Sequence, residues 1–209
     1  MKTRFGLVAV SALLMAGFWP TPVEAQRVEF ELTPFAGGTF FLSNPPSEFL
    51  IHRSGMDALT IGEGEFKNQF TFGLDAGVRI DERYGVEAFF SWLPTELSAA
   101  SGINSAVDVN GYMYGLTFLY HFDPAAQFKP FLGLGVGAET FDYKMAGWDT
   151  ETEYMGNVTV GANVPLTDLL ALRLEARDCI TFFDPGIAGR DSKAQNDLML
   201  LTGLSFRFR

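Results

Sequence analysis

The chain has 209 residues and a formal net charge of −10 at pH 7, with 25 acidic residues against 15 basic ones. This excess of negative charge argues against nucleic acids and anionic surfaces as partners, because both would repel the protein. The single cysteine, Cys179, excludes a framework of intrachain disulfides.

The N-terminus predicts a cleaved export signal over residues 1–25. Lys2 and Arg4 form a short basic region, an apolar region follows at 5–18, and a small-x-small cleavage motif ends at Ala25. The apolar region is shorter than the roughly 20 residues that a helix needs to span a bilayer. We therefore expect a signal peptide, followed by one outer-membrane domain over residues 26–209.

The rest of the chain consists of segments in which apolar residues alternate with small or polar ones. In chain order, we expect strands at 28–41, 69–80, 84–92, 109–122, 128–142, 154–164, 168–181 and 198–208. A period of two gives each strand two different faces. Lengths of about 9 to 14 residues suit tilted strands that cross a bilayer. The sequence thus predicts an all-β fold, an eight-stranded antiparallel up-and-down transmembrane β-barrel.

The connections between these strands alternate in length. Long connections lie at 42–68, 93–108, 143–153 and 182–195, and short ones lie at 81–83, 123–127 and 165–168. Short turns at one rim and long loops at the other are typical of bacterial outer-membrane barrels. The pattern predicts that the long connections face the cell exterior and that both termini lie at the periplasmic rim.

The two faces of the strands differ in chemistry. One face is apolar, whereas the other is rich in glycine and carries charges of both signs: Glu31, Asp75, Arg79, Glu87, Glu139, Arg173, Glu175, Arg177 and Arg207. On the lipid face each charge would cost about 2–4 kcal/mol at mid-depth, whereas opposite charges inside a narrow lumen can pair. A soluble lipocalin-like barrel would turn the apolar face inward, but the glycines favour the charged face as the crowded interior. We expect the charged residues to form an ion-pair network that closes the lumen.

Four stretches of the chain resemble the OmpA-type small outer-membrane β-barrels. They are FELTPFAGG at 30–38, KPFLGLGVG at 129–137, LTDLLALRLEAR at 166–177 and GLSFRF at 203–208. The resemblance implies a barrel set among the lipids and lipopolysaccharide of the cell outer membrane. Because the chain stops at its final strand, we expect no periplasmic domain after the barrel. It also implies insertion by the barrel assembly machinery, which reads a terminal strand ending in aromatic residues, here Phe206 and Phe208.

The residues offer little for catalysis. The chain has two histidines, His52 in a long loop and His121 near the periplasmic rim, and neither has a serine in an obvious position to form a nucleophile–base pair. Glu87 and Glu139 form a conceivable acid–base pair, but arginines on the same face favour structural ion pairing. We therefore expect no enzyme activity and no cofactor.

The sequence also gives little support for a metal site. Glu63 with Glu65, and Glu151 with Glu153, supply oxygen ligands of the kind that divalent cations prefer. Acidic residues in solvated loops are far commoner than cation sites, so we expect no bound metal.

Two hypotheses about function remain. The first is a structural or surface-interaction protein whose lumen is closed by ion pairs. The alternative is a narrow porin or a channel for small hydrophobic solutes, which would need a continuous water path or a lateral opening. The inward-facing Phe35, Phe89 and Phe131 favour closure.

Overall fold

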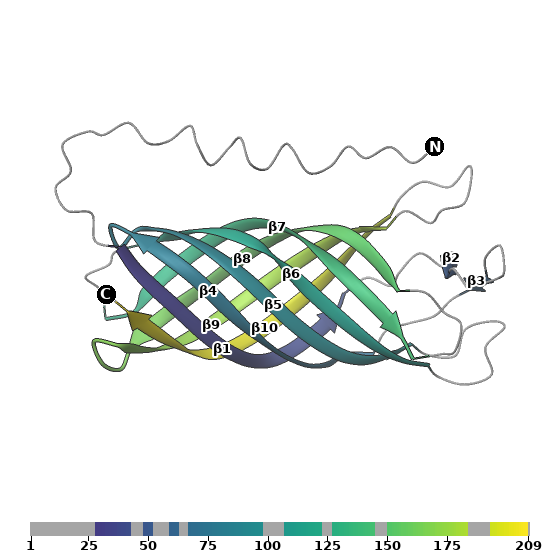
Figure 1. Ribbon diagram of the computed structural model, residues 1–209, viewed down its shortest axis with the longest axis horizontal. Helices are drawn as coiled ribbons and strands as arrows, with labels where there is room; N and C mark the ends of the chain where they lie inside the picture. The colour runs from purple at the N-terminus through teal and green to yellow at the C-terminus, as the bar shows by residue number, and fades with distance from the viewer. Residues whose placement is uncertain are drawn as a thin grey trace, which may run out of the picture.

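Eight long strands close into a barrel in the order β1-β10-β9-β8-β7-β6-β5-β4, as Figure 1 shows. The computed structural model describes residues 28–42, 48–51, 59–62, 67–97, 107–122, 127–144, 150–183 and 193–208. The barrel strands are β1 (Val28–Phe41), β4 (Gln69–Ile80), β5 (Tyr84–Leu97), β6 (Val107–His121), β7 (Lys129–Tyr143), β8 (Glu151–Pro165), β9 (Leu170–Phe183) and β10 (Lys193–Phe208). Each pairs antiparallel with both neighbours, and β1 closes the ring by pairing with β4 and β10. The predicted fold class is confirmed.

Some strands extend further than the sequence predicted. β5 continues to Leu97 rather than residue 92, and β10 begins at Lys193 rather than at 198. The prediction was wrong at these ends because the apolar alternation fades there. The extension of β5 includes Pro94, which lies opposite Asn110 of β6. The connections after β5 and before β10 are therefore shorter than predicted.

The first long connection contains a small hairpin that the sequence analysis missed. It consists of β2 (Glu48–Ile51) and β3 (Leu59–Gly62), paired antiparallel. Figure 1 places it beyond the rim where β1 ends. Each strand has only four residues, which is too short for an alternating pattern to be recognised.

The predicted orientation of the strand faces is confirmed. The charged and glycine-rich face turns into the lumen, while side chains such as Phe70 and Val136 are 73% and 70% exposed on the outside. Gly73 shows why the lumen needs small residues: a Cβ at this position would collide with the ring of Phe35 and with the backbone of Phe90. Glycines thus leave room for the large inward side chains of a narrow barrel.

Aromatic side chains gather on the outer surface near both rims. At the turn side, the ring of Tyr120 lies 5.6 Å from that of Tyr84 and 5.0 Å from that of Phe122. At the loop side, the rings of Phe72 and Trp92 lie 6.4 Å apart. Such girdles mark the two membrane–water interfaces of a barrel. Among the described residues, no helix is long and apolar enough to span a bilayer.

Candidate functional site

A pair of charged side chains joins opposite walls of the barrel at the centre of the lumen. Arg173 of β9 donates from Nη1 to Glu87 Oε2 of β5 at 2.6 Å and from Nη2 to Glu87 Oε1 at 3.0 Å. β9 and β5 stand four places apart in the closed ring of eight, so they face each other across the lumen. This two-pronged geometry is the strongest form of arginine–carboxylate contact. The contact therefore spans the interior rather than lining one wall.

Arg177 and Glu175 extend this contact into a network. Arg177 Nη2 lies 3.2 Å from Asp75 Oδ1 of β4 and 3.6 Å from Glu87 Oε1. Glu175 accepts from Arg177 Nε through Oε1 and from Arg173 Nε through Oε2, both at 2.8 Å. These three β9 residues share the lumen face because they are two apart in sequence. We call the set Asp75, Glu87, Arg173, Glu175 and Arg177 the central cluster.

Aromatic rings pack against the arginines of the central cluster. The guanidinium carbon of Arg173 lies 4.5 Å from the ring centre of Phe131, and that of Arg177 lies 4.2 Å from the ring centre of Phe89. Both arginines are almost fully buried, at 2% and 0% exposed. Cation–π contact strengthens when the charge is shielded from water. Ion pairs and aromatic rings therefore lie together in the lumen at the central cluster.

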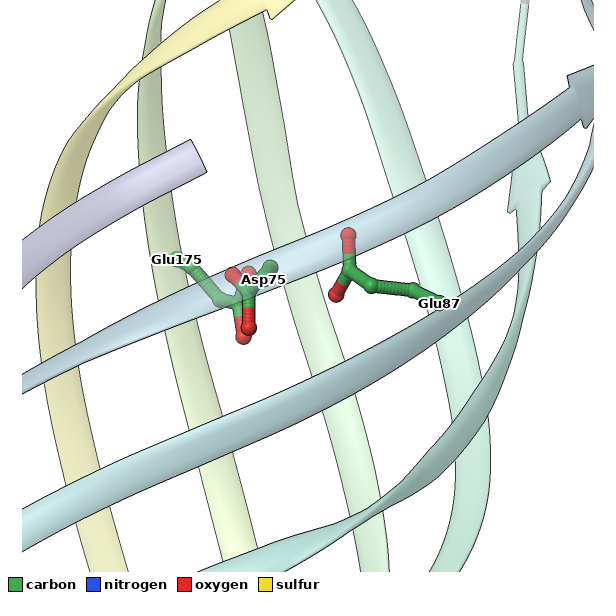
Figure 2. A group of neighbouring side chains, drawn as sticks. All are labelled: Asp75, Glu87 and Glu175. Atoms are coloured by element: carbon green, nitrogen blue, oxygen red, sulfur yellow. The ribbon is translucent and has the colours of Figure 1, made fainter. Parts of the chain in front are cut away.

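Three carboxylates of the central cluster lie close enough to suggest a metal site. Figure 2 shows Asp75, Glu87 and Glu175, each of which offers an oxygen within 4.8 Å of the others. Each of the three accepts a hydrogen bond from Arg173 or Arg177. A cation would have to displace a guanidinium, so the cluster is better suited to holding arginine than to holding metal.

A second group of ion pairs lies toward the turn-side rim. Glu31 of β1 accepts from Arg79 of β4 at 2.8 Å and from Arg207 of β10 at 2.9 Å. Because β4 and β10 both flank β1 in the barrel, this group lines one wall and does not cross the lumen. Glu29 is also buried on this face, a position that the sequence analysis missed although it continues the alternation of Glu31.

The structure separates Glu139 from the ion-pair network into which the sequence analysis had grouped it. Glu139 is fully buried, and its Oε2 accepts a hydrogen bond from Thr181 Oγ1 at 2.9 Å. Glu139 is paired with Glu153 of β8, whereas Glu175 is paired with Gly161 of the same strand. These two partner positions, Glu153 and Gly161, are roughly 26 Å apart along β8. The alternation predicted the correct face but could not give the height, which depends on the strand register.

His121 lies at the turn-side end of β6, as predicted, but its side chain is buried in the lumen. Its ring centre lies 5.5 Å from that of Phe131, and neither ring nitrogen has a hydrogen-bond partner among the described residues. Cys179 is also buried, with its Sγ 4.0 Å from the sulfur of Met199. His52, Glu63 and Glu65 lie outside the described residues.

Comparison with known proteins places this architecture in a family. Residues 9–208 match the outer membrane protein beta-barrel domain. Omp38 of Acinetobacter baumannii is 25% identical over 180 residues, or 83% of this chain and 48% of that protein, so the chain spans about half the length of this curated relative.

Solved structures share the fold at low sequence identity. OprG from Pseudomonas aeruginosa has a TM-score of 0.60 at 15% identity, covering 88% of this chain and 97% of that chain. Neisserial surface protein A has a TM-score of 0.56 at 16% identity, covering 87% of this chain and 99% of that chain. The chain belongs to the outer membrane protein β-barrel family.

Proposed function

We propose that this protein is a closed barrel with a structural or surface-interaction role, rather than a conduit or an enzyme. The observation that carries the proposal is the contact between Arg173 and Glu87, which joins opposite strands across the lumen. Phe89 and Phe131 pack against the arginines at the same level. A lumen filled in this way leaves the rim loops as the surface available for contact with other molecules.

The chemistry of the described residues supports a role without catalysis. The acids of the central cluster all bind arginines, whereas a general base needs a free carboxylate near the reacting group. His121 has no hydroxyl or thiol partner, so it lacks the nucleophile that an acyl-transfer site requires. Structural ion pairing accounts for the lumen charges more fully.

The outer membrane is the location of this family, and we propose the route by which the chain reaches it. Residues 1–25 would direct export and then be removed, and the barrel assembly machinery would read Phe206 and Phe208 of β10. Both phenylalanines are exposed on the outer surface of the barrel. Lipids and lipopolysaccharide would contact the apolar outer face.

The orientation is tested by labelling intact cells with a membrane-impermeant maleimide. Thr150 lies at the loop side and Asp168 in the short turn after β8, and both are exposed. We expect Thr150→Cys to be labelled from outside and Asp168→Cys to stay unlabelled. The native Cys179 is fully buried, so the wild-type protein serves as the unlabelled control. Labelling at residue 168 alone would invert the orientation.

Closure of the lumen is tested by single-channel conductance of the refolded full chain in a planar bilayer. We expect no steady conductance from the wild-type protein. Truncating both arginines with Arg173→Ala and Arg177→Ala removes the bridging groups and should produce measurable current in the protein that still folds. Steady wild-type conductance would refute the proposal and favour the narrow porin. Uptake of a hydrophobic solute without ion current would favour the hydrophobic-solute channel.

A further inference from the structure

A second set of acids lies in the lumen on the loop side of the central cluster. Glu139 of β7 and Asp197 of β10 are both 0% exposed, and Gln195 of β10 is 1% exposed. Gln195 falls in the connection predicted at 182–195, and Asp197 lies just before the strand predicted at 198–208. Their alternation with Met199 and Leu201, also buried, shows that they face the lumen.

Hydrogen bonds join these residues in two pairs, and the strand register places the pairs side by side. Thr181 Oγ1 donates to Glu139 Oε2 at 2.9 Å. Thr181 is the register partner of Gln195, whose Nε2 donates to Asp197 Oδ1 at 2.9 Å and to Oδ2 at 3.0 Å. We call Glu139, Thr181, Gln195 and Asp197 the loop-side acid cluster.

The loop-side acid cluster has no bound base among the residues that the structure describes. Arg177 is the nearest arginine along the lumen face of β9, but its guanidinium bonds to Glu175 and Asp75 on the other side. Cys179 and Met199 lie between, with their sulfurs 4.0 Å apart. Two buried carboxylates without a counter-charge are strongly unfavourable unless a proton or a cation neutralises them.

Uncommitted oxygens of the cluster favour a cation as the neutralising group. Within the described part of the chain, Glu139 Oε1 and Gln195 Oε1 are buried and have no hydrogen-bond partner. A protonated acid has a single O–H and could donate to one acceptor, such as the Gln195 carbonyl, whereas a cation binds several oxygens at once. Thr39 adds a third uncommitted oxygen, since its buried Oγ1 also lacks a partner and Thr39 is paired with Met199, two residues from Asp197. A cation satisfies both the charge and the free oxygen lone pairs.

We propose that Glu139, Asp197 and the carbonyl of Gln195 bind a hard divalent cation, with calcium as the best match. Carboxylate, amide and hydroxyl oxygens are the ligands of calcium, which accepts irregular geometry, whereas magnesium demands a near-octahedral one. The two positive charges balance the two acids. Glu151 and Glu153, partly buried at the loop-side end of β8, add negative charge that raises the local concentration of cations. The site lies at the end of the lumen that we assign to the exterior.

Calorimetric titration of the refolded full chain with calcium chloride tests the site. We expect one calcium ion per barrel, with a dissociation constant of about 0.1–1 mM, as in extracellular modules. The double variant Glu139→Gln/Asp197→Asn should bind more than about tenfold more weakly, because both charged ligands are gone. Glu96→Gln/Asp142→Asn is the matched control, since it removes one Glu and one Asp from partly exposed pairs with Lys67 and Lys144. The control should bind like the wild type.

Three results would overturn the site. One is a wild-type protein without calcium-dependent heat or thermal shift, and another is a double variant that binds calcium as the wild type does. Gln195→Glu provides a further test if the double variant does not refold, because a third carboxylate should make thermal stability depend more steeply on calcium. The third result that would overturn the site is a Gln195→Glu variant whose thermal stability depends on calcium no more steeply than that of the wild type.

Discussion

The central and the loop-side acid clusters bury carboxylates in the same lumen by different means. In the central cluster, Asp75, Glu87 and Glu175 all accept hydrogen bonds from arginines. In the loop-side acid cluster, Glu139 and Asp197 are bonded only by neutral side chains, within the part of the chain that the structure describes. In the first arrangement every acid bonds to an arginine, whereas in the second no acid bonds to a described arginine, and we propose that a ligand takes that place. Burial of acids alone therefore does not indicate what a lumen does; their partners do.

The largest effect is expected from removing the arginines of the central cluster. Arg173→Ala/Arg177→Ala strands three buried acids, and a stranded charge costs about 3–5 kcal/mol where the site is dry. Urea unfolding of the refolded barrel, followed by tryptophan fluorescence, measures the loss. Lys67→Ala is the control, because Lys67 forms an exposed pair with Glu96 that is worth about 1 kcal/mol or less. Similar losses in both variants would mean that the lumen is wet and that the central cluster is not structural.

A charge placed on the outer face gives a second loss of unfolding free energy, with which the loss from the central cluster can be compared. Leu174→Arg places a cation on the lipid side of β9, between the lumen-facing Arg173 and Glu175, and should cost about 2–4 kcal/mol toward mid-depth. Leu169→Arg makes the same change in the exposed turn, where the cost falls to about 0–1 kcal/mol. Unfolding in lipid vesicles compares the two variants. Equal stability of Leu174→Arg and the wild type would reverse the assigned faces.

Neutralising one acid in each cluster sharpens the comparison further. Glu175→Gln weakens hydrogen bonds to two arginines and should cost about 1.5–3 kcal/mol. Asp197→Asn, measured in the presence of a chelator, should leave stability unchanged or raise it, because it removes a buried charge that has no described counter-charge. Unfolding of both variants in the same chelating buffer gives the comparison. Equal destabilisation would show that the two clusters are not chemically distinct.

The smallest effect tests the packing that accompanies closure. Gly73→Ala adds a Cβ against the ring of Phe35, and such overpacking costs about 1–3 kcal/mol. Gly156→Ala is the matched control, because only one atom, at 3.9 Å, lies near its added Cβ. Thermal unfolding should separate the two variants. A Gly73→Ala protein as stable as the control would mean that both the ring of Phe35 and the backbone at Phe90 can move away from the added Cβ.

The sequence predicted the wall of the barrel better than its interior. Alternation is a local property, so it assigned Arg173 and Glu87 to the lumen without any knowledge of their neighbours. Their contact is non-local and depends on strand order and register, which also separate Glu139 from Arg173. The alternation at Gln195 and Asp197 continues that of residues 199–207, yet polar outward residues obscured it. The pairing of β10 with β9 up to Lys193 shows that Gln195 and Asp197 belong to the strand.

A double-mutant cycle on Arg173 and Glu87 tests the central claim, the contact between opposite walls, most directly. Among the described residues, Arg173→Met leaves Glu87 with Arg177 alone, at 3.6 Å, and Glu87→Met leaves Arg173 with Glu175 alone, whereas the double variant removes both members of the contact. We expect the free energies of unfolding to be non-additive, with a coupling of at least about 1.5 kcal/mol, as for close buried charge pairs. Additivity within about 0.3–0.5 kcal/mol, which is typical of residues that do not touch, would contradict the contact and with it the closed lumen.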